Sequence, residues 1–150
     1  MRLVRTLLPA LLACAVTGAV VADEAFDVRL SPTPRDASMK TQIAGHGSAR
    51  VTVRGNKLTI AGNFAAFPSP ATRAALHRGP AVALRGPAIH DLTVSSGTSG
   101  LLTAEVTLSP EELAALEAGQ IYIQIDTELA PEGNIWGWLL PAAVPMIRDR

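Results

Sequence analysis

Apolar and polar residues alternate along much of the chain, and this alternation is typical of half-buried β-strands. In the segment 26–30, Phe26, Val28 and Leu30 alternate with charged residues. The segment 72–77 fits either a strand or a short helical turn. Similar patterns between turn residues predict strands over 48–54, 57–64, 88–94, 101–108, 120–127 and 134–140.

The clearest hairpin is predicted around Gly55 and Asn56. Both residue types tolerate the positive φ of a two-residue turn, so 48–54 and 57–64 are expected to pair across Arg54-Gly55-Asn56-Lys57. The period-2 pattern then places four residues on the buried face, namely Val51, Val53, Leu58 and Ile60.

One helix is predicted over residues 110–118. Ser109 is a good N-cap, Pro110 suits the first helical position, and Glu112 completes a capping box. The residues expected on its apolar face and at its end are Leu113, Leu116 and Gly119.

These elements predict an all-β fold of about eight strands with one short helix, as a β-sandwich or a partly closed barrel. The chain has 150 residues, of which 48% are hydrophobic and 17% charged. This length and composition suit one domain with a real core.

The first 22 residues have the pattern of an export signal. Arg2 and Arg5 precede an uncharged run that ends in the small residue Ala22. We therefore expect a signal peptide over 1–22, a domain over 23–140 and a tail over 141–150. A retained anchor is the alternative, although the run is near the lower length limit for a spanning helix. After signal removal no membrane span is expected.

Cys14 is the only cysteine and lies inside the predicted signal. Its surroundings loosely match a lipoprotein processing site, so lipidation at Cys14 is the alternative to cleavage at Ala22. Either way the mature domain has no disulfide and depends on its core. Removing Arg2 and Arg5 leaves 11 basic against 13 acidic residues, a net charge of about −2. With no basic patch, nucleic acid is not an expected partner.

Two separated stretches carry motifs. The first combines Ala75-Leu76-His77-Arg78-Gly79-Pro80-Ala81 with Gly86-Pro87-Ala88-Ile89-His90-Asp91-Leu92. The second runs from Leu116 to Thr127 and continues with Pro131-Glu132-Gly133-Asn134-Ile135-Trp136-Gly137. In order and spacing, most of 25–140 resembles the CHRD domain family, first named in chordin.

The resemblance implies an immunoglobulin-like β-barrel with limited similarity to copper/zinc superoxide dismutases. In chordin such domains belong to an extracellular binder of growth factors, and bacterial members are mostly exported. The resemblance indicates fold and location far more than function. We expect a non-catalytic binding or structural module of the periplasm or cell exterior, with an unknown envelope protein or glycan as its partner. The alternative is a metal-binding or superoxide dismutase-like protein.

The chain departs from the family at its histidines. Those positions are occupied here by Leu76, Arg78 and Asp126, and the family's late arginine by Trp136. Because Arg78 and Asp126 carry opposite charges, we hypothesise an ion pair between them. Two independent surface charges are the alternative.

Candidate groups for a metal site are few, namely His46, His77, His90 and Asp126. No His-x-His spacing occurs, so neither a metal nor another cofactor is expected. No serine lies in a Gly-x-Ser-x-Gly turn, and His90 and Asp91 would point to opposite faces of a strand. We expect no catalytic site.

The last two predicted strands carry a candidate ligand surface. Trp136 and Trp138 share one strand face, as do Tyr122, Gln124 and Asp126 on the strand before. If the two faces coincide, they form an aromatic platform for a sugar or a partner protein. The alternative is that the tryptophans cover one edge of the core.

Overall fold

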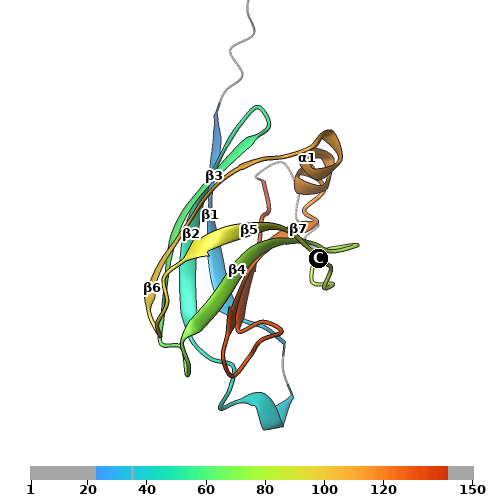
Figure 1. The fold of residues 1–150 in the computed structure, drawn as a ribbon. Helices are drawn as coiled ribbons and strands as arrows, with labels where there is room; N and C mark the ends of the chain where they lie inside the picture. Colours follow the sequence, from blue (N-terminus) through green and yellow to red (C-terminus); the bar gives the residue numbers. More distant parts are fainter. Residues whose placement is uncertain (1–22, 35, 142–150) are drawn as a thin grey trace, which may run out of the picture.

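The computed structural model describes residues 23–34 and 36–141, which form an antiparallel β-barrel with one α-helix (Figure 1). Its elements are β1 (Glu24–Pro32), η1 (Ala37–Met39), β2 (His46–Arg54), β3 (Lys57–Ala65), β4 (Ala71–Arg78), β5 (Ala88–Val94), β6 (Gly100–Thr107), α1 (Pro110–Glu117), β7 (Ile121–Thr127) and β8 (Ile135–Trp138). The predicted signal and the tail beyond residue 141 lie outside the described residues. Within the described part, no helix is long and apolar enough to cross a membrane.

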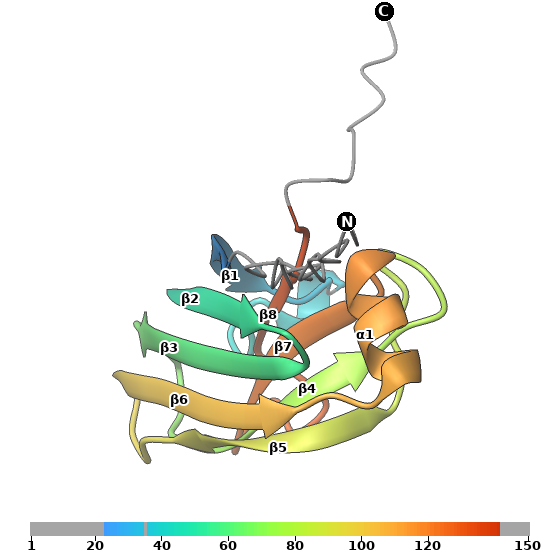
Figure 2. The ribbon, with the colours of Figure 1, turned by 90° about the horizontal axis from the view of Figure 1, so that it is seen from above.

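The eight strands close into a ring in the order β1-β2-β3-β6-β5-β4-β7-β8, as Figure 2 shows from above. The all-β prediction is confirmed, and the architecture is a closed barrel rather than an open sandwich. Two pairings are short. β1 joins β8 through Ser31 and Pro32, and β5 joins β6 through Thr93 and Val94. The barrel therefore consists of two well-paired four-stranded halves joined at two narrow seams, which explains why its strand pattern also suits a sandwich.

The predicted hairpin is confirmed. β2 pairs with β3 around a turn at Gly55 and Asn56, with Arg54 opposite Lys57. Val51, Leu58 and Ile60 are buried in the barrel core, whereas Val53 is half-buried at the barrel end. Residues 72–77, for which the sequence allowed either a strand or a short helical turn, lie within strand β4.

The predicted helix is also confirmed. The Ser109 hydroxyl accepts a hydrogen bond from the Glu112 N–H, and the Glu112 carboxylate accepts one from the Ser109 N–H. Leu116 is buried, and Leu113 packs half-buried against the core. Figures 1 and 2 show α1 at one end of the barrel, where it covers part of the opening.

Candidate binding site on the outer face of β7 and β8

Strand β7 is buried on both faces. Ile121, Ile123 and Ile125 point into the barrel and are fully buried, as their alternation predicts. The opposite face carries Tyr122, Gln124 and Asp126, which are only 1%, 4% and 7% exposed. Polar residues on an outer barrel face are normally solvated. Loops must therefore cover this face.

Four aromatic side chains gather on this outer face, and we call them the aromatic cluster: His77, Tyr122, Trp136 and Trp138. Tyr122 lies opposite Trp138 across the ladder, and Gln124 lies opposite Trp136. The Tyr122 ring centroid is 4.5 Å from that of Trp138, 5.5 Å from that of Trp136 and 5.0 Å from that of His77. The two faces coincide, which meets the condition that the sequence left open. Because Tyr122, Gln124 and Trp136 are buried, however, the surface is not an open platform.

The loop 79–87 covers one end of the aromatic cluster. The Tyr122 hydroxyl accepts a hydrogen bond from the Gly86 N–H at 3.1 Å and donates to the Gly86 carbonyl at 3.2 Å. His77 Nδ1 lies 3.0 Å from the same carbonyl. Two buried nitrogens of the cluster, His77 Nε2 and Trp138 Nε1, have no hydrogen-bond partner among the described residues. The cluster therefore holds this loop against the barrel wall.

The turn 128–134 covers the other end of this face, and Arg85 connects it to the loop 79–87. Arg85 Nη1 donates hydrogen bonds to the Glu132 carbonyl at 2.5 Å and to Gln124 Oε1 at 3.4 Å. The guanidinium carbon lies 5.5 Å from the centroid of Trp136, within the range of a cation–π interaction. Sequence reasoning missed Arg85. Its only local signal is its place in the motif region, directly before Gly86-Pro87.

A pocket of about 270 Å³ opens beside Arg85, and we call it the Arg85 pocket. It lies where three chain segments meet: the end of η1 with the residues that follow it, the loop 79–87 and the turn 128–134. Its lining combines apolar residues with three long polar ones and consists of Met39, Gln42, Ile43, Arg85, Leu129, Ala130, Pro131, Glu132 and Gly133. Leu129 is 50% exposed, although it is a large apolar residue.

Asp126 does not meet Arg78, so the ion-pair hypothesis is corrected. In the β4–β7 ladder Asp126 lies opposite Arg73, and Arg78 lies opposite Ile121. Five positions along a strand separate Arg73 from Arg78, about 16 Å. Asp126 instead accepts a hydrogen bond from the Gln124 amide at 2.8 Å. Burial raises the pKa of Asp126, and the hydrogen bond from Gln124 offsets this only in part.

The three histidines lie in different places. His46 is exposed at the start of β2, His77 belongs to the aromatic cluster, and His90 Nε2 lies 3.0 Å from Glu112 Oε2. The contact of His90 with Glu112 connects β5 to α1 and was not expected from the sequence. Among residues 23–34 and 36–141, no three His, Cys, Asp or Glu side chains come close enough to hold a metal ion together.

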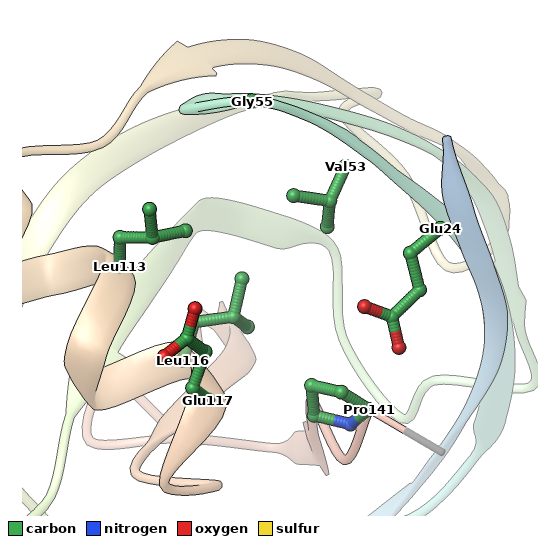
Figure 3. A pocket seen from close by; sticks show the side chains of 7 residues that line it. All are labelled: Glu24, Val53, Gly55, Leu113, Leu116, Glu117 and Pro141. Carbon is green, nitrogen blue, oxygen red and sulfur yellow. The ribbon is translucent and has the colours of Figure 1, made fainter. Parts of the chain in front are cut away.

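A second pocket, of about 180 Å³, lies at the barrel end beside α1 (Figure 3). Leu113 and Leu116 of α1 form one wall, and Val53 of β2 faces them. The other lining residues are Glu24, Gly55, Glu117 and Pro141. The exposed carboxylates of Glu24 and Glu117 form no ion pair with the described residues.

Fold and site together define a small all-β barrel protein with a mixed polar and apolar pocket on its outer wall. A comparison with protein families matches residues 26–139 to the CHRD domain. The match covers more than half of the chain, so the chain belongs to the CHRD domain family, as its motifs predicted. No curated protein and no solved structure gives a significant match.

Proposed function

We propose that this CHRD domain is an exported, non-catalytic binding module of the periplasm or cell exterior. The observation that carries the proposal is the Arg85 pocket, in which a positioned guanidinium lies beside apolar walls. Small-molecule sites commonly combine apolar lining with a few fixed polar groups.

The contacts of Arg85 favour a binding role. Both of its hydrogen bonds within the described part leave from Nη1, so Nε and Nη2 are left to meet a ligand. The ring of Trp136 and the Glu132 carbonyl fix the guanidinium in advance. Such preorganisation reduces the entropy lost on binding.

The proposed location rests on the sequence. A basic start at Arg2 and Arg5, the uncharged run and Ala22 have the pattern of an export signal. The rest of the chain contains no cysteine, so no non-native disulfide can form within it in an oxidising compartment. Detection of the mature protein in the envelope or medium, with its N-terminus at Asp23, tests this part. A chain that keeps its first residues in the cytoplasm would contradict it.

Tryptophan emission tests the binding role. The two tryptophans of the chain, Trp136 and Trp138, both belong to the aromatic cluster, so their emission reports on this face. We expect at least one member of a panel of neutral sugars, acidic sugars and short peptides to change the emission with saturation. No change with any member would contradict the proposal.

Elemental analysis of the purified mature protein separates this proposal from its rival. A binding module of the proposed kind contains no stoichiometric metal. Copper or zinc at one equivalent per chain would favour the metal-binding or superoxide dismutase-like alternative instead.

A further inference from the structure

The charge of Arg85 has no carboxylate partner among the described residues. Three other arginines form ion pairs on the barrel surface: Arg50 with Asp27, Arg54 with Asp23 and Arg73 with Asp91. Arg85 contacts a carbonyl, an amide oxygen and an aromatic ring, and its charge acts on the buried Asp126 carboxylate only from beyond ion-pair distance. A guanidinium that neutral groups fix in place is prepared to receive an anion, because a carboxylate can accept two of its hydrogen bonds.

Two further planar polar residues line the Arg85 pocket, Gln42 and Glu132. Both are exposed, and the Glu132 carboxylate forms no ion pair within the described part. An amide can donate and accept hydrogen bonds, whereas an ionised carboxylate accepts them. Adjacent hydroxyl groups of a sugar ring offer donors and acceptors that suit this pair.

The remaining walls of the pocket are apolar. Met39, Leu129 and Pro131 lie beside the polar residues, and Leu129 is half exposed. The C–H face of a sugar ring can cover such a wall and remove it from water. The pocket thus offers one cation, hydroxyl partners and an apolar wall.

We propose that the Arg85 pocket binds an acidic sugar, with the ring carboxylate at Arg85 and the ring hydroxyls at Gln42 and Glu132. This inference rests on the proposed binding function and deepens it by naming the ligand class. The natural ligand would be a glycan that contains uronic acid units, and a single uronate is its smallest probe.

Isothermal titration calorimetry with three probes tests the inference on the mature protein. D-glucuronate carries both the ring and the carboxylate, D-glucose lacks the carboxylate, and acetate lacks the ring. We expect glucuronate to bind at least about tenfold more tightly than either control, because charge-assisted hydrogen bonds contribute more than neutral ones. Higher salt should weaken glucuronate binding, since the site is partly open to solvent.

Variants at Arg85 locate the binding. Arg85→Ala should lose tenfold or more of the affinity for glucuronate, and Arg85→Lys should lose part of it because an ammonium cannot pair in the bidentate way. Arg50→Ala is the matched control, since it removes an exposed arginine from the β1–β2 surface and should leave the affinity unchanged. Far-UV circular dichroism checks that each variant is folded.

Three results would overturn the inference. They are equal binding of glucose and glucuronate, equal binding of acetate and glucuronate, and unchanged affinity in Arg85→Ala. If a neutral sugar or a peptide alters tryptophan emission while uronates do not bind, the acidic-sugar inference fails and the binding function stands. If no probe binds or alters emission, both fail.

Discussion

At the scale of single residues, Gly133 allows the turn 128–134 to lie flat on β7. Its φ is +122°, and an added Cβ would lie 2.8 Å from Cδ of Gln124. We expect Gly133→Ala to lower the free energy of unfolding by roughly 1–3 kcal/mol, since it adds backbone strain to a steric overlap. The midpoint of urea denaturation measures this loss.

Gly55→Ala is the matched control for that substitution. Gly55 also has a positive φ, +61°, but an added Cβ there meets nothing within 4 Å. Its loss should be smaller, about 1 kcal/mol, because only the left-handed backbone is unfavourable. Equal losses in the two variants would mean that Gly133 does not need its close approach to Gln124.

Ser109 fixes the first turn of α1 through the capping box. Ser109→Ala should lower the free energy of unfolding by about 1 kcal/mol, because the Glu112 N–H loses its acceptor. Ser96→Ala, in the exposed connection between β5 and β6, should change it by less than about 0.5 kcal/mol. If the two variants denature at the same urea concentration, the cap does not contribute as described.

At the scale of elements, Glu112 connects α1 to strand β5. Burial alone would raise the pKa of Glu112, but hydrogen bonds from His90 and from the Ser109 N–H lower it below the ordinary 4.5. A lowered pKa in the folded state means that the carboxylate stabilises the fold above pH 4.5, and that this contribution disappears as the pH falls through the folded pKa.

Glu112→Gln should therefore cost stability at pH 7 and progressively less as the pH falls below 4.5. Urea denaturation of both proteins at several pH values measures the difference. A difference that stays constant from pH 7 to pH 3 would show that ionisation of Glu112 is not the cause.

The separate strands and the helix could be predicted from the sequence. The register between strands and the loops that cover β7 could not. Alternation around Val51 and Leu58, together with Ser109 before Pro110, depends only on neighbouring residues, so hairpin and helix were predictable. The β4–β7 register places Arg73 opposite Asp126. The motif comparison suggested Arg78, which lies five positions further along β4. Burial of Tyr122 depends on the loop 79–87, and the position of Arg85 in that loop depends on the turn 128–134. Both contacts join segments that are remote in sequence.

At the scale of the whole molecule, the barrel closes at two short seams. β1 and β8 pair at two positions, as do β5 and β6, whereas β2 and β3 pair at nine. We expect amide hydrogens at the seams to exchange faster than those of β2 and β3, because fewer ladder bonds must open. Native-state hydrogen exchange measures this, and uniform protection around the barrel would contradict the description of two halves.

The outer wall of β7 and β8 gives the molecule its proposed function. The aromatic cluster holds the loop 79–87 from one side, and Arg85 connects that loop to the turn 128–134 from the other. Function and fold thus depend on the same contacts, so changes that loosen this face should weaken ligand binding and stability together.

The most direct test of the central claim is a chemical-shift map of the ¹⁵N-labelled mature protein titrated with an oligosaccharide rich in uronic acid. The account predicts saturable shifts confined to the three segments of the Arg85 pocket, around Gln42, Arg85 and Glu132. Shifts that cluster instead at the α1 end of the barrel, or the absence of any saturable shift, would contradict it.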